Sequence, residues 1–250
     1  MDVFDCIHTR RTIRKFSDKY VPTELILKII EAGRAAPSVH NYCPVEYIII
    51  REQEFKDKIC DMLLEDHTKR VGKWSRKQVE LNIIKLGKHL KDGESVTSGQ
   101  FGNFYQFVKT VPVMIAVVAN KRKPITLEEA EQLFPKDKNY RTHFMHFHDT
   151  FIAIENCFLA AHALGLGFNL HTRVMRQFRK QMRGILGMPN YYYPHAFLFV
   201  GYPDESPVVE KRLTGEIVHF EKWSKKHDPS QSDQLLKIDP SAAKWNPYGA

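Results

Sequence analysis

An unbroken apolar run constrains the fold of this chain more than any other feature. It reads VPVMIAVVA and occupies residues 111–119. Nine residues are too few for a membrane-spanning helix, which needs roughly 20. The run is rich in β-branched side chains, which favour strands, and apolar residues at every position are typical of a strand inside a protein. It therefore predicts a buried strand, and because no apolar run is longer, we expect no membrane span.

Predicted helices and strands alternate around this run. The stretch 21–37 predicts a helix, because Pro22 suits a first turn and Leu25, Ile29 and Ala32 form an apolar stripe. The other expected elements are a strand at 45–52, a charged and mostly helical stretch at 53–92, a helix from about 148 to 164, a basic helix after it and a strand at 196–203. We expect one α+β domain, residues 1–223, followed by an extended polar tail, residues 224–250.

Composition favours an intracellular globular protein. The chain has 250 residues, 43% of them hydrophobic, which is enough for one large domain with a core of its own. Its cysteines show no paired or metal-like spacing, so we expect free thiols at Cys6, Cys43, Cys60 and Cys157. Asp2 and Asp5 stand where a signal peptide would be basic or apolar. We therefore expect a cytoplasmic location.

The net charge of +8 is unevenly distributed. Residues 69–91 contain eight Lys or Arg and one acid, and a basic helix at 173–183 would carry Arg173, Arg176, Lys180 and Arg183 on one face. Both segments can be solvated helix faces, or they can attract an anionic substrate or an acidic partner. Because no zinc-finger spacing or RNA-binding aromatic signature accompanies them, we expect no nucleic-acid binding.

Three other motifs carry little chemistry by themselves. GLGFNL (165–170) lacks the third glycine of a dinucleotide fingerprint and follows a helix, so it is better explained as a helix stop. His143 and His146 can share a helix face, but nothing points to a further ligand, and we expect no metal site. Cys43 can be a reactive thiol, although no neighbouring base is visible in the sequence.

The N-terminal stretch IHTRRTIRKF suits a phosphate group. Guanidinium groups bind phosphate oxygens in bidentate fashion, and the hydroxyl of Thr12 can donate to another oxygen. In an extended segment Arg10, Thr12 and Arg14 would point to the same side. From these residues alone, a solvated basic N-terminus explains the charges equally well.

Two further segments, APSVHNYCPVEYIII (36–50) and VGYPDESPVVEKRLTGEIVHFE (200–221), follow RRTIRKF in order. Together the three resemble the nitroreductase family of FMN-dependent oxidoreductases, in register from about residue 3 to 223. The resemblance implies a nitroreductase-like three-layer α/β/α fold with a central mixed, mainly antiparallel sheet. It also implies a buried central helix, HDTFIAIENCFLAAHALGLGF, and an intertwined homodimer with FMN at the subunit interface. The tail can then wrap around the partner subunit.

The resemblance also assigns residues to the cofactor. Arg10, Arg11 and Thr12 would bind the FMN phosphate, and Arg14 would lie near the ribityl chain and the pyrimidine end of the flavin. Ser38 and Asn41 belong to a loop that contacts the ring from the other subunit. The phosphate would receive a further basic residue, which is Arg212 or Lys211.

This sequence departs from the family pattern near the expected substrate. Cys43 replaces a glutamine of the ring-contact loop, and Thr172 and Arg173 fall on glycine positions. Arg173, with His171, can recognise an anionic substrate, or Arg173 can simply begin the basic helix. Aromatic residues fall where the family varies its substrate lid, and they suit either a flat ring or core packing: Phe101, Phe104, Tyr105 and Phe107.

The resemblance implies a ping-pong reaction with no catalytic side chain. NAD(P)H would deliver hydride to flavin N5, and a nitroaromatic, quinone or similar small acceptor would take the electrons. Two alternatives remain open. One is a specialised dehalogenating or flavin-cleaving member of the same fold. The other is an FMN-binding or sensing protein without nicotinamide-driven turnover.

Overall fold

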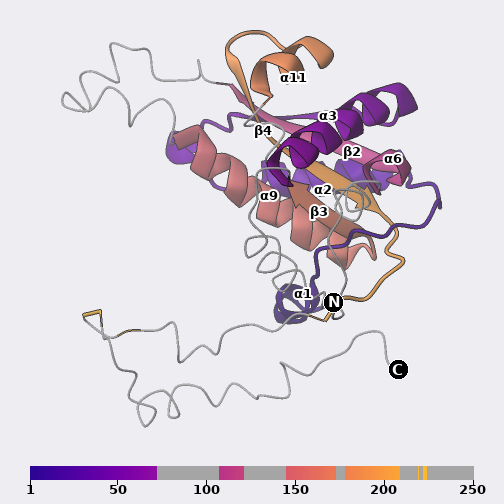
Figure 1. Ribbon diagram of the computed structural model, residues 1–250. Coiled ribbons are helices and arrows are strands. Elements are labelled where there is room, and N and C mark those ends of the chain that lie inside the picture. The colour runs from indigo at the N-terminus through magenta and orange to yellow at the C-terminus, as the bar shows by residue number, and fades with distance from the viewer. Residues whose placement is uncertain (72–106, 121–144, 173–177, 209–218, 220–221, 224–250) are drawn as a thin grey trace, which may run out of the picture.

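A computed structural model describes residues 1–71, 107–120, 145–172, 178–208, 219 and 222–223 (Figure 1). Several predictions therefore fall outside the described residues: the rest of the basic segment 69–91, the aromatic residues at 101–105, and the tail 224–250. None of the helices that the structure describes is both long and apolar enough to span a bilayer. All four cysteines carry free thiols, as the sequence predicts.

Four strands form an antiparallel sheet in the order β1-β2-β4-β3. They span Val45–Ile50 (β1), Val113–Asn120 (β2), Gly167–His171 (β3) and Tyr192–Gly201 (β4). The predicted buried strand is confirmed as β2, which is buried from Val113 to Ala119. Outside these strands, an isolated parallel bridge joins Thr12 to Phe168 of β3.

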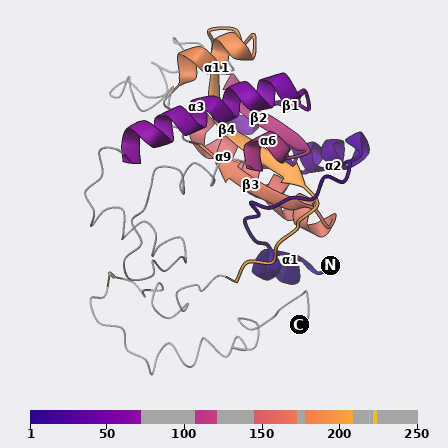
Figure 2. The ribbon, with the colours of Figure 1, turned by 45° about the vertical axis from the view of Figure 1, so that its right-hand side comes forward.

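Helices cover both faces of the sheet and give the three-layer α/β/α arrangement (Figure 1, Figure 2). One layer contains α2 (Thr23–Arg34) and α9 (Met145–Ala163), and the opposite layer contains α3 (Gln53–Val71), α6 (Phe107–Thr110) and α11 (Arg179–Ile185). Short helices α1 (Val3–Thr9) and η1 (Val39–Asn41) complete the described elements. The predicted α+β fold is confirmed.

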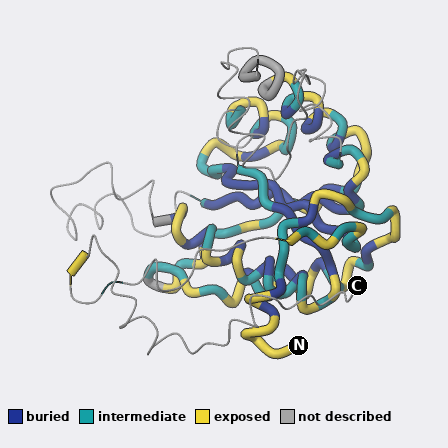
Figure 3. Tube along the Cα trace, turned by 60° about the horizontal axis from the view of Figure 1, so that its bottom comes forward, coloured by how far each residue is buried: buried dark blue, intermediate teal, exposed yellow. Residues whose placement is uncertain are grey.

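The two helical layers explain why β2 is apolar from Val113 to Ala119. Its side chains alternate between the faces. Ile115 packs with the α2 and α9 layer, and Met114 and Ala116 pack with the α3 layer. Figure 3 shows the buried residues concentrated in the sheet and on the inner sides of the helices. A strand between two such layers has no solvent-facing side on which a polar residue would be stable.

Helix α9 is the predicted central helix, and it leads directly into the edge strand β3. The helix ends at Ala163, and Gly165 follows with a φ of 75°, a value that favours glycine, so the helix-stop interpretation of GLGFNL is confirmed. The sequence analysis expected no strand at β3 and no helix at α1. Both elements are short, and Phe168 in β3 packs against Phe158 of α9, with ring centroids 4.0 Å apart.

The segment that follows α2 is attached to the N-terminal part of α9. The backbone N–H of Val39 donates to Oδ1 of Asp149 over 3.2 Å. Asp149 is buried, and burial raises the pKa of its carboxyl, although the Val39 N–H and the nearby His148 act in the opposite direction. The loop therefore depends on an acidic group that is costly to ionise where it lies.

Replacing Asp149 by asparagine should make stability less sensitive to pH. Folding raises the pKa of this carboxyl above its unfolded value, so ionisation weakens the fold as the pH rises through the folded pKa. The asparagine amide would keep an acceptor for the Val39 N–H without ionising. We expect the free energy of unfolding of Asp149→Asn, relative to wild type, to increase from about pH 4 to about pH 7 in urea titrations. The exposed Asp18→Asn is the control, and a difference that does not change with pH would contradict the expectation.

Helices α2 and α9 cross closely at Gly33, so an alanine there should destabilise the protein. An added Cβ would lie 2.6 Å from Sγ of Cys157 and closer still to the hydroxyl of Tyr47. We expect Gly33→Ala to lower the free energy of unfolding by about 1–3 kcal/mol, measured by urea denaturation. Gly184→Ala in α11 is the matched control, because nothing lies within 4 Å of its added Cβ. It should be neutral or stabilising by up to about 1 kcal/mol, and equal effects of the two variants would refute the crowding argument.

Candidate functional site

The basic N-terminal segment lies along the outer edge of β3. The backbone N–H of Ile13 donates to the carbonyl of Phe168 over 2.9 Å, and Nδ2 of Asn169 donates to the carbonyl of Ile13 over 3.0 Å. The side chain of Ile13 is buried against Gly167, where an added Cβ would approach it to 3.0 Å. This contact brings the segment close to the strand, and the glycine permits it.

The segment that follows β4 also holds the basic segment. Ser17 N–H donates to the carbonyl of Tyr202, and Asp204 N–H donates to that of Lys15, each over 2.9 Å. The Glu205 carboxylate accepts the backbone N–H groups of Arg14 and Lys15. Hydrogen bonds to β3 and to this second segment therefore fix the backbone of the basic segment. Its side chains remain available to bind a ligand.

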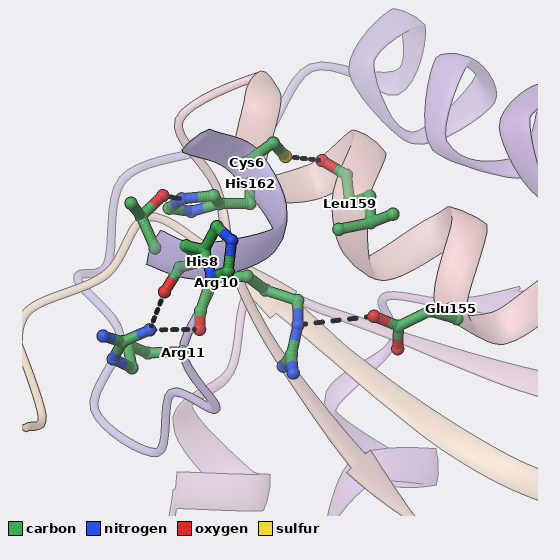
Figure 4. Close-up of polar contacts among 8 residues, drawn as sticks. Cys6, His8, Arg10, Arg11, Glu155, Leu159 and His162 are labelled. Atoms are coloured by element: carbon green, nitrogen blue, oxygen red, sulfur yellow. Dashed lines mark hydrogen bonds and ion pairs between the residues drawn. The ribbon is translucent and has the colours of Figure 1, made fainter. Parts of the chain in front are cut away.

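Arg10 points toward α9 (Figure 4). Its Nε lies 3.5 Å from Oε1 of Glu155, and its Cζ lies 4.7 Å from the centre of the Phe158 ring. The Glu155 side chain is 56% exposed, so this ion pair is screened by water and contributes little stability. The guanidinium of Arg10 is thus held near α9 by weak interactions.

Arg11 points the other way, back over the end of α1 (Figure 4). Its Nη1 donates to the carbonyls of His8 and Arg10, over 2.7 and 2.8 Å. Its side chain also lines a small pocket together with Ile13 and His162. The two adjacent arginines therefore diverge around the C-terminal end of α1.

Helix α1 is fixed to the C-terminal end of α9 by two polar contacts. Thr9 Oγ1 and His162 Nε2 share a hydrogen bond of 2.6 Å, and the Cys6 thiol donates to the carbonyl of Leu159 over 3.2 Å. Burial and then the charges of Arg10 and Arg11 hold the pKa of His162 below its usual value. The sequence patterns did not predict α1, although a helix-capping residue stands at its start. Asp2 is an N-cap residue whose carboxylate accepts the Phe4 N–H over 2.9 Å.

The predicted ring-contact loop lies at a different part of α9. The Cys43 N–H donates to Oγ of Ser38 over 2.8 Å, and Asn41 and Cys43 have positive φ angles of 58° and 45°. The loop borders a cavity of about 60 Å³ that Asp149 also lines. The loop contacts Asp149 of α9, and Arg10 contacts Glu155 of the same helix, six residues further along. Within the chain, the two predicted parts of the site are separate groups.

The predicted substrate residues are described only in part. His171 ends β3 opposite Phe197, and both His171 and Thr172 are half-buried. Phe107 packs in the core at 5.1 Å from the Phe199 ring, which confirms core packing for this member of the aromatic set. The other candidates lie outside the described residues: Phe101, Phe104, Tyr105, Arg173, Lys211 and Arg212.

The basic helix differs from the single charged face that was predicted. It is described only from Arg179 to Ile185, and Lys180 is exposed. Arg183 instead donates from Nε and Nη2 to the carbonyl of Tyr192, over 3.2 and 2.9 Å. The guanidinium of Arg179 lies 4.1 Å from the centre of the Tyr193 ring. One of the expected surface cations, Arg183, and the neighbouring Arg179 therefore fasten α11 to β4.

One histidine of the HFMHFHD run forms a buried pair. Nδ1 of His146 lies 3.0 Å from Nε2 of His195, which is the extra residue of a β-bulge between β2 and β4. The ring of Tyr193 lies 4.9 Å from that of His195. Among the residues that the structure describes, no group of three or more His, Cys, Asp or Glu side chains is arranged to hold a metal ion.

Known proteins are similar to this chain in sequence. A protein of Methanothermobacter thermautotrophicus named NADH dehydrogenase/NAD(P)H nitroreductase is 28% identical over 229 residues, which cover 89% of this chain and 88% of that protein. The FMN reductase (NAD(P)H) of Bacillus subtilis is 23% identical over 222 residues, covering 88% of this chain and 73% of the relative.

The fold is also found in solved structures. Oxidized iodotyrosine deiodinase bound to FMN and 3-iodo-L-tyrosine matches with a TM-score of 0.66 at 20% identity, over 89% of this chain and all of that one. At this identity the match establishes the fold alone. The sequence model of the nitroreductase family matches residues 7–202, which include the basic segment and the whole sheet. The chain therefore belongs to the nitroreductase family.

Proposed function

We propose that this protein is an FMN-dependent oxidoreductase that uses NAD(P)H to reduce a nitroaromatic, quinone or similar small acceptor in a ping-pong reaction. FMN, when bound, supplies the two-electron transfer between donor and acceptor. Membership of the nitroreductase family supports an oxidoreductase, and the names of the two relatives support NAD(P)H as donor and FMN as the flavin.

The observation that carries the proposal is the fixed basic segment at the edge of β3. Arg10 and Arg11 diverge from the end of α1, and Thr12 follows at the bridge to Phe168. The Arg10 guanidinium and the Thr12 hydroxyl suit the oxygens of a phosphate monoester, and the Arg11 guanidinium adds a second positive charge nearby. Because the present ion pair of Arg10 with Glu155 is weak, a phosphate can take its place at small cost.

We assign the remaining cofactor contacts in the same proposal. Arg14 would lie near the ribityl chain and the pyrimidine end of the flavin, and Lys211 or Arg212 would return to the phosphate. Ser38 and Asn41 would contact the ring of the flavin bound by the partner subunit. This last assignment agrees with their separation from Arg10 within one chain.

The substrate would lie at the end of β3. His171 and Thr172 are near this end, and Arg173 follows them, so an anionic acceptor is our preferred subclass. Cys43 would face it from the ring-contact loop, and Phe101, Phe104 and Tyr105 would stack on a flat ring. The basic segments 69–91 and 173–183 would favour the approach of an anionic substrate or an acidic partner.

A dehalogenase is the second candidate function. Solved iodotyrosine deiodinase has this fold with a TM-score of 0.66, and its name and bound ligand identify a halogenated aromatic substrate for that protein. The phosphate site would be the same in either enzyme, and the acceptor would differ. A panel of acceptors can therefore separate the two functions.

We further propose a homodimer that involves α1 and α9. Both helices expose large apolar side chains: Val3 (57%), Phe4 (68%) and Ile7 (47%) on α1, and Phe147 (42%) and Ile152 (44%) on α9. Exposed apolar side chains in such number mark an interaction surface. The tail 224–250, with Leu235, Leu236, Ile238 and Trp245, would wrap around the partner subunit.

The proposed function predicts a yellow protein that NAD(P)H bleaches. The purified protein should show flavin absorbance, and anaerobic NADH or NADPH should remove it. A nitroaromatic, a quinone or a halotyrosine should then restore it, and the fastest of the three identifies the acceptor class. A bound flavin that stays oxidised would favour the FMN-binding or sensing alternative, and a protein that cannot be reconstituted with FMN would refute the proposal.

An Arg10→Ala variant tests the phosphate site within the same proposal. Loss of a charge-assisted contact should weaken FMN binding by about 10- to 100-fold, measured by quenching of flavin fluorescence. Riboflavin, which has no phosphate, should bind equally to wild type and variant. Lys58→Ala, a surface change in α3, is the control. An equal loss for FMN and riboflavin would remove Arg10 from the phosphate.

The proposed dimer predicts that a charge on α9 separates the subunits. Ile152→Asp should lower the mass in sedimentation equilibrium from dimer to monomer, because an interface cannot solvate the carboxylate. Leu27→Asp on α2 is the control, since Leu27 is equally apolar and 53% exposed. Truncation after residue 223 should weaken the dimer if the tail wraps around the partner. A wild-type monomer, or a dimer unaffected by Ile152→Asp, would contradict this interface.

A further inference from the structure

A histidine lies close to the two arginines of the proposed phosphate site. His162 stands in the last turn of α9, and its Nε2 shares the 2.6 Å hydrogen bond with the hydroxyl of Thr9 (Figure 4). Thr9 is only 2% exposed, so a hydroxyl without this bond would be poorly hydrated. The contact joins the last residue of α1 to the last turn of α9, across 153 positions of sequence.

The end of α1 in turn determines where both arginines begin. Arg10 is the C-cap of α1, and its N–H donates to the carbonyl of Cys6. Arg11 bonds the carbonyls of His8 and Arg10. A displacement of Thr9 would therefore displace the carbonyls that hold Arg11 and the backbone that carries Arg10.

We propose that His162 is a positioning residue of the FMN phosphate site, and that its protonated form strengthens phosphate binding. The proposal rests on the function proposed above, because it assumes that a flavin phosphate binds at Arg10 and Arg11. It adds a residue to which the sequence assigned no role at the cofactor, and a dependence of cofactor affinity on pH.

The charged groups around His162 explain the dependence. Arg10 and Arg11 face it from the segment after α1, and together with burial they hold the pKa of its imidazole below the usual value. A third cation beside two guanidinium groups is unfavourable until an anion arrives. A phosphate at the arginines supplies that anion, so it should raise the pKa of His162. By thermodynamic reciprocity, protonation of His162 should then tighten phosphate binding by the same factor.

The acidic groups near His162 do not cancel the coupling between its protonation and phosphate binding. Glu155 lies on α9 seven residues before His162 and pairs weakly with Arg10. Glu205 lines the same pocket as His162, but its carboxylate accepts the backbone N–H groups of Arg14 and Lys15. The thiol of Cys6 is kept neutral because burial raises its pKa. Of the described residues around His162, the two arginines are the charges that a phosphate would neutralise most directly.

The test compares FMN with riboflavin over a range of pH. Dissociation constants are measured by fluorescence quenching with protein freed of flavin, from about pH 5.5 to about pH 8. The FMN phosphate itself titrates near pH 6, so each result is compared with His162→Gln, which keeps a hydrogen-bonding side chain but carries no charge. Relative to this variant, wild type should gain about fivefold in FMN affinity toward low pH. Riboflavin affinity should show no such gain.

Three further variants separate the positioning role from general effects. His8→Gln changes an exposed imidazole beside Thr9 and should behave like wild type. Thr9→Ser keeps the hydroxyl and should also do so. Thr9→Val should weaken FMN binding at every pH while leaving riboflavin binding unchanged. Equal FMN affinities of Thr9→Val and wild type would overturn the positioning role.

A measurement on the wild-type protein keeps the proposal testable if His162→Gln does not fold. The titration of His162 followed by NMR should shift to higher pH when FMN is added, and an unchanged titration would overturn the proposal. So would identical pH profiles of wild type and His162→Gln. Wild-type protein that binds no FMN at any pH would instead refute the proposed function, which is a distinct outcome.

Discussion

Strand β2 is apolar on both faces and must be covered on both. The other described elements provide this cover. Helices α2 and α9 cover one face, and α3, α6 and α11 cover the other. Strands β1 and β4 take up the backbone hydrogen bonds of β2 on its two sides. The helical layers leave the outer edge of β3 accessible, and there the basic segment joins the sheet.

The elements with strong sequence patterns were predictable. The nine-residue apolar run predicted β2, and the apolar stripe of residues 21–37 predicted α2, because periodicity records which side of an element is buried. The elements α1 and β3 have seven and five residues, too few for a clear period. Their positions follow from contacts with residues distant in the sequence, such as Thr9 with His162 and Ile13 with Phe168.

In the candidate site, too, the sequence predicted some features, and tertiary contacts determine the others. The sequence identified the basic segment, but the alternation of an extended chain could not show that Arg11 turns back to the carbonyls at the end of α1. Nor could charge spacing show that Arg183 would bond the carbonyl of Tyr192 instead of facing solvent with Lys180. Both side chains follow backbone acceptors whose positions are set by tertiary packing. His162 carries no motif, and only the fold brings it to Thr9.

The attachment of residues 12 and 13 to Phe168 also affects association of the protein with itself. The exposed edge of a sheet can pair with a strand from another molecule, and natural proteins protect such edges. Here the proposed cofactor-binding motif covers part of the edge of β3, and its neighbouring charges discourage a second strand. A proteolytic cut that released the N-terminal segment would therefore remove the proposed phosphate ligands and at the same time uncover an aggregation-prone edge.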